Sequence, residues 1–128
     1  MREPSVLVVD DEELVGQLIC DALEDAGCDV ICTASGAEAL NLLSAGAHEW
    51  AGVVTDINLG RGAPRGWDVA RAARQATPAI AVIYVSGDSS HEWPVQGVPL
   101  SIMISKPFTP SRVVVALADL LNGRQVVL

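Results

Sequence analysis

The sequence has few aromatic side chains, no long apolar run and no recognisable leader. Aromatic residues make up only 4% of the 128 residues, so a core must consist mainly of Val, Ile, Leu and Ala. The apolar runs, such as Ser5–Val9, are far shorter than the roughly 20 residues that a membrane-spanning helix needs. Near the N-terminus, Arg2 is followed at once by Glu3, which is not the pattern of a secretory signal peptide. We therefore expect a cytoplasmic protein that is not inserted in a membrane.

Basic residues are also scarce. The chain has 8 Lys and Arg against 16 Asp and Glu, which gives a formal net charge of −8. An acidic domain repels phosphate backbones, so direct binding to nucleic acid is not expected. Half of the residues are hydrophobic and only 19% are charged, a composition that excludes a disordered linker. Clustered carboxylates can also prepare a cation site, which would make part of the acidity local.

The chain has three cysteines, Cys20, Cys28 and Cys32. This odd number, without a secretory leader, favours reduced thiols. Cys28 and Cys32 fall in one expected strand, where four residues span about 13 Å, too far for a disulfide. We expect all three side chains to behave as small buried hydrophobes.

Short apolar runs and amphipathic segments alternate five times along the chain. The expected strands cover residues 6–9, 28–33, 52–55, 79–85 and 100–104. Expected helices cover residues 12–26, which Gly27 ends, and 67–77, and others follow Ser35 and Thr109 as caps. The segment 88–99 should hold a helix that Pro94 and Gly97 shorten or distort. Strict alternation predicts an α/β fold, a parallel sheet with helices on both faces, in a single domain over residues 1–128.

Polar residues stand where four of the expected strands end. Asp10 and Asp11 follow the first strand, Asp56 the third, Ser86 the fourth and Lys106 the fifth. The carboxyl ends of parallel strands share one edge of the sheet, where such folds bind their ligands. Residues that are far apart in the sequence are therefore expected to meet there.

The three carboxylates of this set repel one another unless a cation lies among them. An all-oxygen set suits Mg²⁺, which keeps several waters and prefers a phosphate oxygen as a further ligand. Lys106 adds a positive charge and Ser86 a hydrogen-bond donor. Together these groups fit a phosphoryl group carried by a nucleophilic aspartate.

Four short motifs carry a resemblance to a known family. They are Val-Val-Asp-Asp-Glu at 8–12, Val-Thr-Asp-Ile-Asn-Leu at 54–59, Val-Ser-Gly at 85–87 and Ser-Lys-Pro-Phe at 105–108. In this order, and at strand ends, they resemble the response-regulator receiver domain of two-component signalling, of the chemotaxis-regulator type, over essentially the whole chain. The resemblance implies a flavodoxin-like (βα)5 fold with a doubly wound five-stranded sheet in the order 2-1-3-4-5.

The resemblance also implies a role for each strand-end residue. Asp56 is the expected phosphoacceptor. Asp11 and Asp56 are expected to ligate Mg²⁺ together with the main-chain carbonyl of Asn58, and Asp10 to act mainly through a metal-bound water. Ser86 is expected to hydrogen-bond the phosphoryl group.

Lys106 is expected to form an ion pair with the phosphoryl group, aimed by a cis bond to Pro107. The implied donor is a phosphohistidine on a sensor histidine kinase or a phosphotransfer protein. We expect a stand-alone receiver that catalyses only its own phosphorylation and dephosphorylation and signals through protein contacts. A domain excised from a larger kinase would have the same sequence features.

Two features depart from the pattern of this family. Met103 stands where many receivers have Tyr or Phe, so the usual aromatic switch is absent and the coupling to the surface is left open. The loop after Asp56 is long and contains Arg61 and Arg65. These two arginines can contact an acidic partner or the phosphoryl group, or they can simply be solvated. Trp93 is either an exposed anchor for a partner or packed on the core.

Plainer interpretations of the same residues stay open. The two aspartates after the first strand can cap a helix, Asp56 can be an ordinary loop acid, Ser86 and Asn58 can be turn residues, and Lys106 can be solvated. Two other functions also compete: a receiver-like interaction module that phosphate does not switch, and a phosphohydrolase with an aspartyl nucleophile. Such hydrolases usually need a second acid two residues after the nucleophile, where this chain has Asn58.

Overall fold

A computed structural model describes residues 3–46, 49–60, 62 and 64–123. Five parallel strands form one sheet in the order β2-β1-β3-β4-β5. The strands are β1 (Ser5–Val9), β2 (Asp29–Thr33), β3 (Trp50–Asp56), β4 (Ala81–Ser86) and β5 (Ser101–Ser105). The helices are α1 (Glu13–Asp25), α2 (Gly36–Ser44), α3 (Gly66–Ala76), α4 (Trp93–Gln96) and α5 (Pro110–Gly123), with a 3₁₀ turn η1 (Ser90–Glu92) before α4. The prediction of a doubly wound sheet in the order 2-1-3-4-5 is confirmed.

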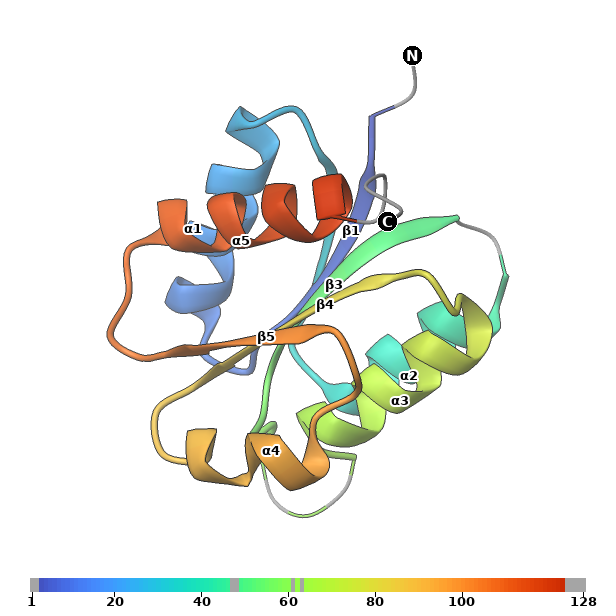
Figure 1. Cartoon of the computed structure of the whole chain (residues 1–128), viewed down its shortest axis with the longest axis vertical. Coiled ribbons are helices and arrows are strands. Elements are labelled where there is room, and N and C mark those ends of the chain that lie inside the picture. The colour runs from blue at the N-terminus through green and yellow to red at the C-terminus, as the bar shows by residue number, and fades with distance from the viewer. Residues whose placement is uncertain (1–2, 47–48, 61, 63, 124–128) are drawn as a thin grey trace.

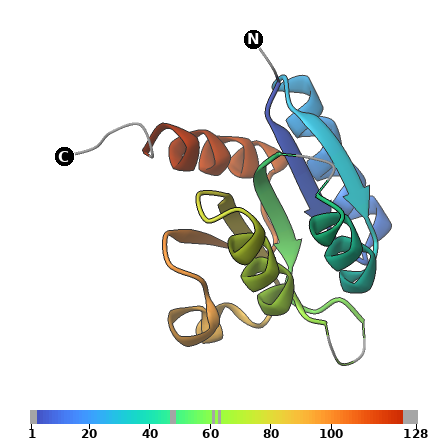
Figure 2. The ribbon, with the colours of Figure 1, turned by 90° about the vertical axis from the view of Figure 1, so that its right-hand side faces the viewer.

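Helices cover both faces of this sheet. α1 and α5 lie on one face, and α2 and α3 lie on the other (Figure 1). The view turned by 90° shows α2 and α3 side by side against the sheet (Figure 2). Each face has its own apolar core, which includes Leu43 and Ala73 under α2 and α3, and Ile19 and Leu117 under α1 and α5. None of the helices in the described ranges is long and apolar enough to cross a membrane.

The central strands are buried on both faces, which explains their unbroken apolar runs. Every residue of β4 is buried, as are the last four residues of β1. Tyr84 of β4 is the largest fully buried side chain in the described part of the chain. Its ring centroid lies 4.8 Å from that of Trp67 in α3. Two of the few aromatic residues therefore pack together in the layer between β4 and α3.

The ends of α1 and α2 follow local signals in the sequence. Gly27, just beyond α1, has a φ of 97°, a conformation that residues other than glycine rarely adopt. Ser35 caps α2 through its Oγ, which accepts a hydrogen bond from the amide of Glu38 at 3.1 Å. Both predicted helix boundaries are confirmed.

The connection between β4 and β5 holds much less helix than the other connections. η1 has three residues and α4 has four, with Pro94 in the first turn and Gly97 directly after the last residue. Trp93, the first residue of α4, is half-buried and packs against the core. Its Nε1 donates a hydrogen bond to Ser101 Oγ at 2.9 Å. Of the two interpretations of Trp93, packing on the core is confirmed.

The cysteines differ from the prediction. The structure joins Cys20 of α1 to Cys32 of β2 in a disulfide, with the two Cα atoms 6.7 Å apart. Cys28 is a free, half-buried thiol, and Cys32 is exposed. The prediction of three reduced, buried thiols is therefore wrong for this pair. The spacing of residues 28 and 32 excludes only a bond within one strand, whereas Cys20 and Cys32 face each other from a helix and the neighbouring edge strand.

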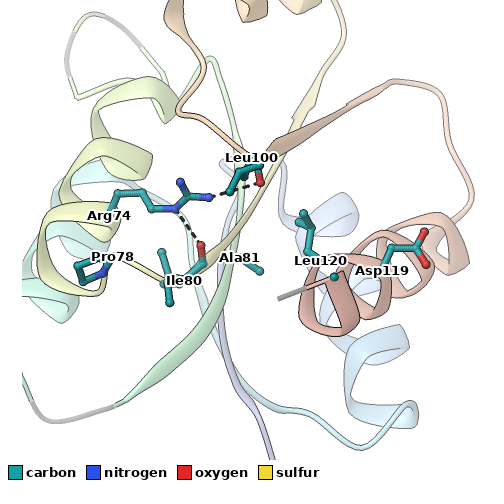
Figure 3. Close-up of a pocket in the computed structure, with 9 residues that line it drawn as sticks. Arg74, Pro78, Ile80, Ala81, Leu100, Asp119 and Leu120 are labelled. Atoms are coloured by element: carbon teal, nitrogen blue, oxygen red, sulfur yellow. Dashed lines mark hydrogen bonds between the residues drawn. The ribbon is translucent and has the colours of Figure 1, made fainter. Parts of the chain in front are cut away.

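Arg74 of α3 holds the amino-terminal end of β4 and the turn before β5. Its Nε donates to the carbonyl of Ile80 at 2.9 Å, and an Nη donates to the carbonyl of Leu100 at 3.4 Å (Figure 3). These bonds satisfy main-chain carbonyls at the edge of the sheet opposite the polar strand ends. Arg74 thereby fixes α3 against two strands of the sheet.

Candidate functional site

Three carboxylates meet at the carboxyl edge of the sheet. Asp10 and Asp11 directly follow β1, and Asp56 ends β3, the neighbouring strand. One carboxylate oxygen from each residue lies within 4.8 Å of the others. Asp10 and Asp56 are buried, whereas Asp11 is exposed. The structure thus brings together the three acids that follow the predicted strands.

Close main-chain packing fixes the position of Asp56. Its Oδ1 accepts a hydrogen bond from the amide of Ile57 at 2.8 Å. Gly66, the first residue of α3, lies so close that a Cβ there would overlap the Asp56 carbonyl. The Gly66 amide also donates to the carbonyl of Ile57 at 2.8 Å. The start of α3 therefore supports Asp56, whose second oxygen, Oδ2, faces Lys106.

Lys106 forms ion pairs with three acids of the site. Its Nζ lies 3.1 Å from Asp56 Oδ2, 2.6 Å from Glu12 Oε1 and 3.7 Å from Asp10 Oδ2. Burial disfavours its ammonium form, but the hydrogen bonds to Glu12 and Asp56 outweigh this effect. The pKa of Lys106 therefore lies above its ordinary value, and the side chain stays charged at neutral pH.

Glu12 belongs to this cluster although sequence reasoning missed it. Its side chain is exposed and makes the shortest contact of Lys106. The signal was present in the sequence, because Glu12 is the third consecutive acid after β1. An acid at this strand end is placed to meet the same lysine as Asp10.

Main-chain contacts join the ends of β4 and β5. The amide of Lys106 donates to the carbonyl of Ser86 at 2.8 Å, and the bond to Pro107 is cis, as the resemblance implies. Ser86 Oγ accepts hydrogen bonds from the amides of Ser89 at 2.7 Å and Asp88 at 3.3 Å. In both bonds Ser86 is the acceptor, so its own hydroxyl proton is left for a further acceptor.

The surroundings of Asp10 indicate that these acids suit a cation. Its Oδ1 accepts a hydrogen bond from the amide of Glu12 at 2.8 Å, whereas its Oδ2 is buried without a hydrogen-bond donor among the described residues. Burial, with a further contribution from the charge of Asp56, raises the pKa of Asp10 to about 6. Burial also raises the pKa of Asp56, although Lys106 opposes this shift. Buried carboxylates of this kind suit a hard divalent cation such as Mg²⁺.

Asn58 closes one side of the site through side-chain hydrogen bonds. Its Nδ2 donates to Asp88 Oδ1 at 2.9 Å, and its Oδ1 accepts from Arg65 Nη2 at 3.0 Å. Arg65 also pairs with Glu92 of η1 at 3.6 Å. Arg65 is therefore not simply solvated, because it links the loop after β3 to the segment after β4. Arg61, the other arginine of the loop, lies outside the described residues.

An open pocket of about 360 Å³ lies among these side chains. It is lined by Asp11, Glu12, Asp56, Asn58, Gly87, Asp88 and Lys106. Four of the six residues predicted for the site line the pocket: Asp11, Asp56, Asn58 and Lys106. Of the other two, Asp10 forms an ion pair with Lys106, and Ser86 directly precedes Gly87, which lines the pocket. Its lining combines carboxylates with one cation, so the pocket can receive a metal ion and an anionic group together.

The fold and this pocket together define a signalling domain of two-component systems. The sequence matches the family described as the response regulator receiver domain over residues 6–118, and the chain belongs to this family. The family that the four motifs predict is therefore confirmed. Receiver domains bind Mg²⁺ at an acidic pocket, and the cluster of Asp10, Asp11 and Asp56 could hold a metal here.

Known proteins that resemble this chain share its fold over nearly its whole length. A receiver protein from Sinorhizobium medicae is 41% identical, with a TM-score of 0.91, over 96% of this chain and 98% of that one. CheY4 of Vibrio cholerae, 24% identical, has the same fold, with a TM-score of 0.77 over 93% of this chain and 99% of that one. An NtrX-like response regulator of Rickettsia conorii is 31% identical over 91% of this chain but only 25% of its own length. The chain thus spans about a quarter of the length of the curated relatives that it matches.

Proposed function

We propose that this domain accepts a phosphoryl group on Asp56, in a Mg²⁺-dependent reaction, from a phosphohistidine of a sensor histidine kinase or a phosphotransfer protein. The observation that carries the proposal is the setting of the Asp56 carboxylate. It is buried beside two further acids, and its Oδ2 lies 3.1 Å from Lys106 Nζ. We assign residues 1–128 to this one receiver domain and place it in the cytoplasm.

The reaction replaces one bond to phosphorus with another. A carboxylate oxygen of Asp56 attacks the phosphorus of the phosphohistidine, the P–N bond breaks, and the imidazole leaves with the bonding electrons. Water later hydrolyses the acyl phosphate, which returns the carboxylate and inorganic phosphate. The domain catalyses only these two steps on itself, so it is a switch rather than an enzyme that acts on other substrates.

The acidic residues would hold the metal. Asp11 and Asp56, with the main-chain carbonyl of Asn58, would bind Mg²⁺ directly, and Asp10 would act mainly through water. When bound, this ion supplies positive charge that offsets the charge of the transferred group. The raised pKa of Asp10 and its buried oxygen without a donor support this assignment, because a nearby divalent cation favours ionised carboxylates.

Lys106 and Ser86 would bind the oxygens of the phosphoryl group. The lysine can exchange its exposed partner, Glu12, for a phosphoryl oxygen without losing an ion pair. Ser86 can donate the proton that its present hydrogen bonds do not use. Phosphorylation adds about −1.5 to −2 charges in the pocket and shifts the domain between pre-existing states. The output would pass to an unidentified partner protein through a changed surface.

Two alternative functions fit the site less well. An interaction module that phosphate does not switch has no need for a buried aspartate paired with a lysine. A phosphohydrolase with an aspartyl nucleophile usually needs an acid at position 58, and Asn58 is instead held between Asp88 and Arg65. Both alternatives remain outcomes of the experiment below.

Intact mass after incubation with Mg²⁺ and a small acyl phosphate tests the proposal. We expect one added phosphoryl group on the wild type, and none in EDTA or in Asp56→Asn. Asp119→Asn, which removes the same charge from an exposed position of α5, is the matched control and should react normally. No adduct from either acyl phosphate or a phosphorylated histidine kinase would contradict the proposal and favour the interaction module. Turnover of an unrelated phosphomonoester would favour the hydrolase.

A further inference from the structure

Two cysteines face each other where α1 lies beside the edge strand β2. Cys20 stands in the middle of α1, and Cys32 is the fourth residue of β2, which in the described part of the chain pairs only with β1 (Figure 2). Their Cα atoms are 6.7 Å apart, within the range of about 4.4–6.8 Å that is usual for disulfides. The two sulfurs can therefore bond without a movement of the main chain.

The two sulfurs differ in their access to solvent. Cys20 is only 3% exposed and belongs to the apolar core under α1 and α5. Cys32, on the edge strand, is exposed. Thiol–disulfide exchange requires the attacking thiolate to reach a sulfur atom directly. A small thiol or a small disulfide can therefore react at Cys32, whereas Cys20 is reached only by Cys32 itself.

The reduced pair fits the same arrangement of α1 and β2. The Sγ of Cys32 lies 3.9 Å from the carbonyl oxygen of Gly16 in α1, a distance at which a thiol donates a weak hydrogen bond. A reduced Cys20 stays in the apolar core, where a free cysteine behaves as a small hydrophobe. The two forms can therefore interchange while the protein remains folded.

The third cysteine is not an alternative partner. Cys28 precedes β2 by one residue and is a free, half-buried thiol. Four residues of extended chain place it about 13 Å from Cys32 along the strand. Burial, with a smaller contribution from Glu3, raises the pKa of its thiol, and the thiolate is the form that reacts. Cys28 therefore exchanges slowly at neutral pH and leaves the reaction to the other two cysteines.

We propose that Cys20 and Cys32 are a redox-active pair, oxidised by small disulfides and reduced by small thiols. The Cys32 thiolate attacks one sulfur of the small disulfide, whose S–S bond breaks, and one small thiolate leaves. The Cys20 thiolate then attacks the Cys32 sulfur of the mixed disulfide and displaces the second small thiolate. The protein loses two electrons, and its two thiol protons pass to the two small thiols that are formed. Reduction follows the same steps in reverse and begins at the Cys32 sulfur.

The closed bond makes the stability of the domain depend on its redox state. It joins α1 to β2 across a sequence separation of 12 residues, which restricts the unfolded chain more than the folded one. Neither cysteine lines the acidic pocket. The inference therefore does not depend on the function proposed above.

The experiment incubates the folded, full-length chain with an excess of either oxidised or reduced glutathione and then alkylates the free thiols in denaturant. Intact mass counts the alkylated cysteines. After oxidised glutathione we expect only Cys28 to be alkylated, and after reduced glutathione all three cysteines. Thermal unfolding of the two samples should show a melting temperature about 10 °C higher for the oxidised one, as expected for a loop of this length in a domain of this size.

Variants of each cysteine test the order of the steps. Cys20→Ala removes the second thiol, so Cys32 should retain one bound glutathione after treatment with oxidised glutathione. Cys32→Ala leaves only the buried thiol of the pair, which should stay unmodified under the same conditions. Cys28→Ala is the matched control and should open and close like the wild type. Asp56→Asn should also behave like the wild type, because the pair is separate from the acidic pocket.

The outcomes decide between a redox-active pair and an inert one. A bond that reduced glutathione opens only after the protein is unfolded would overturn the inference, since the pair would then be purely structural. Alkylation of all three thiols after oxidised glutathione would overturn it as well. Equal uptake of glutathione by Cys20→Ala and Cys32→Ala would contradict the entry of the reagent at Cys32. A failure of Asp56 to accept a phosphoryl group would leave the inference standing.

Discussion

Asp10 makes the stability of the metal-free domain depend on pH. Its pKa rises from 3.8 to about 6, mainly because the carboxyl group is buried. The folded protein therefore binds this proton more tightly than the unfolded chain, and the free energy of unfolding falls as the pH rises from about 4 to about 6. Above that window the ionised side chain destabilises the fold by up to about 3 kcal/mol, since one pKa unit corresponds to about 1.4 kcal/mol.

Asp10→Asn should remove this destabilisation. In EDTA we expect the variant to be more stable than the wild type by about 1–3 kcal/mol near neutral pH, and to differ little near pH 4. Urea unfolding at several pH values measures the difference, with Asp119→Asn as the control for a lost surface charge. Mg²⁺ should stabilise the wild type more than the variant, because the variant loses one carboxylate of the site. A variant that is less stable than the wild type near neutral pH would contradict this prediction.

Some residues of the site could be predicted from the sequence and others could not. Asp10, Asp56 and Lys106 stand directly at strand ends, so the alternation of strands and helices is enough to bring them together. Arg65 could not be placed, because its contacts with Asn58, at the other end of the same loop, and with Glu92, in the segment after β4, depend on how these loops pack. A side chain with several rotatable bonds gives no local signal of where its end will lie.

The start of α3 is the element that most directly supports Asp56, the proposed phosphoacceptor. Gly66→Ala would place a Cβ against the Asp56 carbonyl and the Ile57 Cα, and neither main-chain atom can move without shifting the end of β3. We expect the unfolding free energy to fall by about 2 kcal/mol or more, as in other overpacked sites, together with slower phosphorylation of Asp56.

Gly123→Ala is the matched control for this change, because nothing lies within 4 Å of a Cβ at that position. We expect no loss of stability there, since alanine is the better helix former. Urea unfolding and the rate of mass increase with acyl phosphate measure both variants. Equal stability of Gly66→Ala and the wild type would mean that the loop around Asp56 adapts to the extra carbon.

The elements differ in how well their sequences predict them. Strands that are buried on both faces, such as β1 and β4, have continuous apolar runs that predict them. The sequence does not define the segment of η1 and α4 clearly, because Pro94 and Gly97 leave it too short for a periodic pattern. Its position depends instead on hydrogen bonds from Tyr84 and Ser101, which tertiary packing creates. The pairing of Cys20 with Cys32 likewise depends on how α1 lies beside β2.

On the scale of the whole molecule, an apolar surface lies beside the acidic pocket. Leu14 and Leu18 of α1 are 81% and 57% exposed. An adjacent pocket of about 260 Å³ is lined by Val15, Leu18, Ile19, Lys106, Pro107, Phe108 and Pro110. The two pockets share Lys106, so a protein that covers the apolar one lies next to Asp56. Under the function proposed above, a protein that donates a phosphoryl group to Asp56 would meet this surface.

Leu18→Ser should therefore slow phosphorylation by a protein donor without affecting the chemistry. Losing the burial of one leucine side chain at the interface should reduce transfer from a phosphorylated histidine phosphotransfer protein by about tenfold or more. The rate with small acyl phosphate should stay unchanged, because that donor needs no docking surface. Val95→Ser, at an 85% exposed position of α4, is the matched control and should leave both rates unchanged. Equal slowing with both donors would place the effect of Leu18 in the pocket itself, and no slowing with either would exclude this face as the docking surface of the donor.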